Sequence, residues 1–159
     1  MTSTWIDAGI VAKARRSPTL LPKPRDWAPH ISVSGFLFLP QEDTFTPSKD
    51  LLEFLDAGNP PVYIGLGSIV VDNPQAATSM IFEAIRGAGV RALVSKGWSD
   101  IGNTSMDLPK DVFLIDSIPH TWLFERVSVV VHHGGAGTTA EGLRSGKPSV
   151  IVPFFGDVS

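Results

Sequence analysis

From residue 62 onward, short apolar runs alternate with helix-forming stretches, and this alternation is what most constrains the fold. Apolar runs typical of buried strands lie at 62–66, 91–95, 112–115, 127–131 and 149–153. Helical stretches at 74–88, 121–124 and 138–145 lie between most of these runs. Strands connected through helices pair in parallel and are covered on both sides. The sequence therefore predicts an α/β fold, a Rossmann-like parallel sheet with helices on both faces.

The first fifty residues show no such alternation. Prolines interrupt every candidate helix there, at Pro18, Pro22, Pro24, Pro29, Pro40 and Pro47. One apolar run, 31–39, is long enough for a short strand, and 51–57 is predicted to form a short amphipathic helix. We therefore expect an extended, proline-rich lead-in or linker over residues 1–50 and one folded domain over residues 51–159.

Composition and charge exclude several classes of protein. The 159 residues carry 13 Lys and Arg against 16 Asp and Glu, a net charge of −3, which disfavours nucleic acid as a partner. The chain has no cysteine, so it has no disulfides and no thiolate metal sites. It also lacks a signal-peptide pattern and any apolar run near the roughly 20 residues of a transmembrane segment. These observations favour a cytoplasmic protein.

Residues suited to ligand binding follow each predicted strand. In open parallel sheets, ligands bind beyond the carboxyl ends of the strands. The residues at those ends are Gly67 and Ser68, then Lys96, Gly97 and Trp98, then 116–120, then His132 and His133 with the glycines after them, and finally Gly156 and Asp157. We expect one binding site along this edge of the sheet.

The strongest local signal is the segment 132–139, which reads His-His-Gly-Gly-Ala-Gly-Thr-Thr between a strand and a helix. Its glycines let backbone N–H groups approach a ligand, and the helix N-terminus supplies partial positive charge. A histidine and a threonine hydroxyl can add donors. This combination predicts a phosphate site. The alternative is a tight glycine turn with a threonine cap and a histidine in the core.

The same segment could also be read as a site for a dinucleotide or for a metal ion. Residues 135–140 fit the dinucleotide fingerprint G-x-G-x-x-A, and Asp157 lies where its ribose-binding acid would be. That fingerprint normally opens its domain, whereas at least three predicted strands precede it here, so NAD binding is a minor alternative. Adjacent residues at a strand end point to opposite faces, so His132 and His133 do not predict a metal site.

Several of these segments together resemble the C-terminal, donor-binding half of GT-B glycosyltransferases. The likeness is strongest to sterol 3-β-glucosyltransferases of the UDP-glycosyltransferase family. The segments are 61–68 (Pro-Val-Tyr-Ile-Gly-Leu-Gly-Ser), 95–98 (Ser-Lys-Gly-Trp), 118–120 (Ile-Pro-His), 132–139 and 148–157. The resemblance implies a truncated C-terminal half of a GT-B fold. It further implies binding of a UDP-sugar, with UDP-glucose favoured, for transfer of a hexose to a sterol or other lipid-like acceptor.

The resemblance also implies which residues contact the donor phosphates. Gly67 and Ser68 lie where the first loop approaches the diphosphate, and His133 matches a histidine that contacts it. The matching phosphate cradle at the start of the helix consists of Gly135, Ala136, Gly137 and Thr138.

For the rest of the donor, the resemblance implies a second set of contacts. Glu141 matches the acid that holds the ribose hydroxyls, and Ile118 and His120 lie in the segment that flanks the uracil. Trp98 is the candidate for stacking on the base, because Ser117 replaces the tryptophan of many plant relatives. Asp157 matches the acid that binds the sugar, although Val158 replaces the glutamine that follows it in the family.

No catalytic residue is assigned to this chain. In the family, the catalytic histidine base and the acceptor site belong to an N-terminal domain without a counterpart here. We therefore expect an enzyme by family, with an isolated chain that is inactive. The resemblance implies no metal or other cofactor, and peripheral membrane association in full-length members. The alternatives are a non-catalytic nucleotide-sugar-binding fragment and a subunit that needs a separate acceptor domain.

Overall fold

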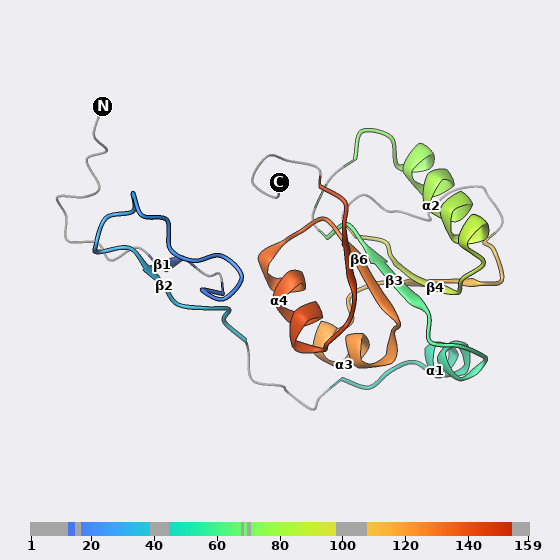
Figure 1. Ribbon diagram of the computed structural model, residues 1–159. Helices are drawn as coiled ribbons and strands as arrows, with labels where there is room; N and C mark the ends of the chain where they lie inside the picture. Colours follow the sequence, from blue (N-terminus) through green and yellow to red (C-terminus); the bar gives the residue numbers. More distant parts are fainter. Residues whose placement is uncertain are drawn as a thin grey trace. The chain divides into compact units, whose positions relative to one another are not determined.

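The computed structural model describes residues 13–14, 17–38, 45–67, 69, 71–97 and 108–153 (Figure 1). The chain divides into two compact units, Met1–Leu39 and Pro40–Ser159, so the predicted division after residue 50 lies inside the second unit.

The first unit contains one short parallel pair, β1 (Lys13–Ala14) with β2 (Ser32–Val33). The strand predicted over 31–39 is therefore limited to two residues within the part that is described. Gly35, two residues after β2, has a φ of +84°, outside the extended region.

The second unit is built on a five-stranded sheet in which every pairing is parallel, which confirms the predicted α/β fold. The strands are β3 (Val62–Gly65), β4 (Ala92–Ser95), β5 (Val112–Ile115), β6 (Val129–His132) and β7 (Ser149–Ile151). Their order is β5-β4-β3-β6-β7. The chain first extends the sheet from β3 toward β5, then returns to place β6 on the other side of β3. The order thus reverses between β3 and β6, which is where open α/β sheets bind ligands.

Helices cover both faces of this sheet, as predicted. They are α1 (Lys49–Asp56), α2 (Pro74–Ala88), α3 (His120–Leu123) continued by the 3₁₀ turn η1 (Phe124–Arg126), and α4 (Ala136–Arg144). Alternation along β4 separates two apolar clusters. Leu93 packs with residues of α1, α3 and η1, whereas Ala92 and Val94 pack with α2.

The end of β6 and the start of α4 both differ from the predicted positions. The difference sets the length of the turn at the candidate site. The strand predicted over 127–131 is β6 at Val129–His132, so His132 is its last residue. The helix predicted from residue 138 begins at Ala136, because Gly135 is the N-cap. The turn between strand and helix is therefore only three residues long, His133 to Gly135.

Candidate nucleotide-sugar site

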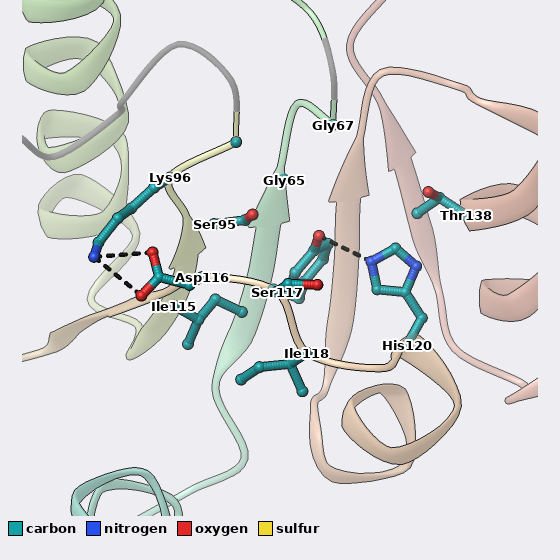
Figure 2. Close-up of a pocket in the computed structure, with 12 residues that line it drawn as sticks. Gly65, Gly67, Ser95, Lys96, Ile115, Asp116, Ser117, Ile118, His120 and Thr138 are labelled. Atoms are coloured by element: carbon teal, nitrogen blue, oxygen red, sulfur yellow. Dashed lines mark hydrogen bonds and ion pairs between the residues drawn. The ribbon is translucent and has the colours of Figure 1, made fainter. Parts of the chain in front are cut away.

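A cavity of about 470 Å³ lies at the carboxyl ends of β3, β4 and β5 (Figure 2). Residues from three strand ends, from α3 and from the first turn of α4 surround it. They are Tyr63, Gly65, Gly67, Ser95, Lys96, Gly97, Ile115, Asp116, Ser117, Ile118, His120 and Thr138. The predicted location of the site, at this edge of the sheet, matches the position of the cavity.

Tyr63 brings a phenol to the cavity from inside the sheet. Tyr63 and Gly65 are two residues apart on β3 and share a face. A Cβ atom at Gly65 would collide with the Tyr63 hydroxyl, so the glycine makes room for the ring. The hydroxyl lies 3.2 Å from Nε2 of His120. The sequence predicts Tyr63 as part of a buried strand, and the Tyr-x-Gly spacing is the signal that points to its place in the cavity.

His120 forms one wall of the cavity as the first residue of α3. Its ring stacks on Phe124, with centroids 4.6 Å apart and an interplanar angle of 13°. Burial lowers the pKa of His120 below its usual range, so the imidazole is neutral near pH 7. Burial raises the pKa of the Tyr63 hydroxyl, an effect that a hydrogen bond with Ser95 opposes. The Tyr63–His120 hydrogen bond therefore joins two uncharged groups.

An ion pair lies on the cavity rim between the ends of β4 and β5. Lys96 Nζ is 3.0 Å from Asp116 Oδ1, and Figure 2 shows the two side chains turned toward each other. The Asp116 side chain is 80% exposed, so water screens this attraction. The pair contributes charge to the rim and little to stability.

Two glycines lie against the His133 ring at the point where the strand order reverses. A Cβ atom on Gly67 would lie 2.6 Å from Cε1 of His133, and one on Gly135 would lie 2.5 Å from its Nε2. Gly67 also has a φ of +64°, which favours glycine. The His133 ring thus fits between two glycines that belong to the loops after β3 and β6.

The N-terminus of α4 has no side-chain cap. Its N-cap is Gly135, and Ala136 and Gly137 are exposed. The Thr139 hydroxyl instead donates to the backbone oxygen of Gly135, at 2.9 Å. The first N–H groups of a helix have no partner within the helix and carry partial positive charge. This end of α4 is therefore suited to bind an anion beside the cavity.

The structure brings some of the predicted donor-binding residues together and not others. Four line the cavity: Gly67, Ile118, His120 and Thr138. Four more form the adjoining turn and helix start: His133, Gly135, Ala136 and Gly137. Glu141 is not among the residues that line the cavity; its side chain is 11% exposed and lies 3.7 Å from Arg144 of the same helix. Three lie outside the described residues: Ser68, Trp98 and Asp157.

Two further properties concern the described part of the chain alone. No three His, Asp or Glu side chains gather there in a group that could hold a metal ion. None of the helices found there combines the length and apolar character needed to cross a membrane.

Sequence comparison relates the chain to glycosyltransferases. Residues 97–159 match the family described as erythromycin biosynthesis protein CIII-like, C-terminal domain. The sterol 3-beta-glucosyltransferase UGT80A2 of Arabidopsis thaliana is 50% identical over 142 residues, which are 89% of this chain and 22% of that protein. The sterol 3-beta-glucosyltransferase of Leptosphaeria maculans is 44% identical over 89% of this chain and 10% of its own length. The chain thus spans less than a quarter of the length of each of these two relatives.

Comparison with solved structures supports the same fold. Arabidopsis thaliana UGT89C1 superposes with a TM-score of 0.66 at 23% identity, covering 91% of this chain and 38% of that one. The same protein, solved in complex with UDP, gives a TM-score of 0.61. Together, the strand order and these matches identify the chain as part of a C-terminal glycosyltransferase domain of the GT-B type, similar in sequence to sterol 3-beta-glucosyltransferases.

Proposed function

We propose that the chain binds a UDP-sugar, with UDP-glucose favoured, as the donor-binding part of an enzyme that glycosylates a sterol or another lipid-like acceptor. The acceptor class rests on the names of the two sterol 3-beta-glucosyltransferases, and the nucleotide on the UDP complex of UGT89C1. Because the chain spans only a small part of those relatives, both remain proposals for this protein.

The main support for the proposal is that the cavity lies next to the start of α4, which has no side-chain cap. The cavity has the volume of a small-molecule site, and its lining mixes aliphatic, aromatic and hydroxyl groups, as a nucleoside requires. The exposed backbone at Ala136 and Gly137 adjoins Thr138, which lines the same cavity. A nucleoside in the cavity would thus direct its diphosphate toward the N–H groups of α4.

The chemistry assigned to this half of the site is stabilisation of the leaving group. When an acceptor oxygen attacks the anomeric carbon, the bond to the diphosphate breaks and negative charge increases on the phosphate oxygens. Fixed N–H donors at the start of α4, together with His133, would stabilise that charge without needing to reorganise. The base that takes the acceptor proton is proposed to belong to another domain, and no metal ion is part of the proposal.

The proposal places the protein in the cytoplasm, at membrane surfaces where lipid acceptors are found. Two related possibilities are a non-catalytic nucleotide-sugar-binding fragment and a subunit that pairs with a separate acceptor-domain chain. Incubating the full chain with labelled UDP-glucose and a sterol tests the expected inactivity in isolation. Transfer without any partner would contradict the assignment of the base to another domain.

The primary test is a thermal-shift titration of the full chain with UDP, UDP-glucose and NAD. A ligand that binds only the folded state raises the melting temperature. We expect UDP and UDP-glucose to stabilise the chain, with or without a metal chelator, and NAD to have no effect. A folded chain that responds to NAD alone would favour a dinucleotide site. One that responds to none of the three would contradict the proposed function.

A further inference from the structure

We propose that His132 is a positioning residue that fixes the turn between β6 and α4, and thereby the His133 ring and the start of the helix. The importance of this turn for ligand binding rests on the proposed function. The contacts that define the role of His132 are independent of it.

His132 lies at the end of β6 and is completely buried. Its Nδ1 accepts a hydrogen bond from the backbone N–H of Gly134, two residues later, at 3.1 Å. Gly134 has a φ of +96°, so the chain changes direction there. The imidazole therefore fixes the turn at Gly134, the residue with the positive φ.

Gly134 is held from both sides of the turn. His132 accepts from its N–H, and the Thr139 hydroxyl, from α4, lies 3.3 Å from its carbonyl oxygen. His133 immediately precedes Gly134, and its ring occupies the space between Gly67 and Gly135. A change in the orientation of the Gly134 peptide would move the His133 ring and the first N–H groups of α4 together.

Packing alone does not explain an imidazole at this position. Val130, on the same face of β6, belongs to the apolar core beside α3 and η1. With Nδ1 as the acceptor, the neutral ring carries its proton on Nε2. Among the described residues this buried Nε2 has no hydrogen-bond partner, and a buried donor without a partner is unfavourable. A hydrocarbon side chain would avoid that cost, so the specific contribution of the imidazole is the acceptor at Nδ1.

Substitution of His132 by leucine and by asparagine separates a packing role from the positioning role. The two side chains are a matched pair because both branch at Cγ. His132→Asn places an oxygen where Nδ1 accepts, in the geometry of an Asx turn, whereas His132→Leu places a methyl group there. Leucine is the better residue for an apolar core, and a buried amide is costly. A purely structural role therefore predicts that the leucine variant equals or exceeds the asparagine variant in both melting temperature and UDP affinity.

If His132 positions the turn, the two variants should rank in opposite orders for melting temperature and for UDP affinity. We expect His132→Leu to melt at or above the temperature of His132→Asn, yet to bind UDP about tenfold more weakly than the unmodified chain. We expect His132→Asn to stay within about threefold of the unmodified affinity. Equal affinities for the two variants, or a stronger one for the leucine variant, would overturn the inference.

A second measurement decides the inference if a variant does not fold or if the unmodified chain does not bind UDP. Long-range ¹H–¹⁵N NMR of the unmodified chain reports which nitrogen of each histidine carries a proton. We expect His132 to carry it on Nε2, with Nδ1 unprotonated. A proton on Nδ1 would overturn the inference whatever the ligand results, whereas failure of the unmodified chain to bind UDP would count against the proposed function alone.

Discussion

Two sides of the same cavity are built in different ways. Near β3 and β6, glycine backbone lies against the His133 ring, at Gly67 and Gly135. Near β4, β5 and α3, side chains form the wall, with Tyr63 bonded to His120 inside and Lys96 paired with Asp116 on the rim. The backbone side has no room for an added Cβ atom, whereas the side-chain wall can lose one contact at a time. Substitutions should therefore have large effects on the first side and graded effects on the second.

The largest effect is expected for Gly67→Ala. The substitution combines a positive φ with a Cβ atom 2.6 Å from the His133 ring, so we expect a loss of about 3 kcal/mol in the free energy of unfolding. Gly146→Ala is the matched control, since Gly146 has a φ of +65° and nothing within 4 Å of the added Cβ atom. Denaturant unfolding of both variants measures the difference. Equal losses would show that the contact with His133 is unimportant.

Gly87→Ala is a second control, with neither a positive φ nor a close contact of the added Cβ atom. Gly87 lies within α2, and its added Cβ atom would meet nothing within 4 Å. Alanine is the better helix former, so we expect this variant to gain about 0.5–1 kcal/mol.

The next largest effect is expected for His133→Ala, which removes the side chain that lies against Gly67 and Gly135. Hydrogen bonds to charged groups contribute about 1.5–3 kcal/mol, so we expect UDP affinity to fall about tenfold or more. Isothermal titration of UDP measures this loss, with uridine as a control ligand whose affinity should change little. An unchanged UDP affinity would contradict the phosphate role of His133.

A pH dependence follows from two histidines, the half-buried His120 in the cavity wall and the fully buried His132. Burial lowers the pKa of His120, and burial followed by the neighbouring His133 and His120 lowers that of His132. The unfolded chain therefore binds protons on both at higher pH than the folded chain does. Stability is retained above the usual histidine pKa of about 6.5 and decreases as the pH falls below it.

Thermal melts between pH 7.5 and 5 measure this dependence. His120→Gln and His132→Asn should each reduce the loss of melting temperature at acid pH. If neither variant changes the slope, other groups control the acid sensitivity.

A smaller effect is expected for Tyr63→Phe on the side-chain wall. The substitution keeps the ring and removes the hydrogen bond to His120, so we expect a loss of about 1 kcal/mol in the free energy of unfolding. The His120 tautomer, measured by NMR, should become less uniform. Unchanged stability together with an unchanged tautomer population would indicate that the hydroxyl does not fix His120.

The smallest effect is expected for Asp116→Asn on the rim. The ion pair with Lys96 is exposed, and such pairs contribute about 0–1 kcal/mol. We expect a change of at most about 0.5 kcal/mol that disappears in high salt. A larger loss that persists in high salt would indicate that the pair has a structural role beyond surface charge.

The sequence predicted part of the site because some of its signals are local. The glycines after β6, the segment with Ile118 and His120, and the strand-end position of Gly67 can be recognised within a few residues. Tyr63 was missed because a tyrosine in an apolar run is normally a core residue. For Glu141, the family resemblance implies a contact with the ribose hydroxyls, which stays a prediction; in the structure its carboxylate lies 3.7 Å from Arg144 of the same helix.

Local periodicity by itself determined that this chain forms a parallel sheet with helices on both faces. The patterns of strands and helices involve residues that are close together in the chain, so they can be recognised without the structure. The order of the strands was decided by the tertiary structure. Only when β6 pairs with β3 does the His133 ring lie between Gly67 and Gly135, and only when α3 packs on that face does His120 meet Tyr63. These contacts join residues far apart in the chain, so they depend on long-range packing that no local pattern specifies.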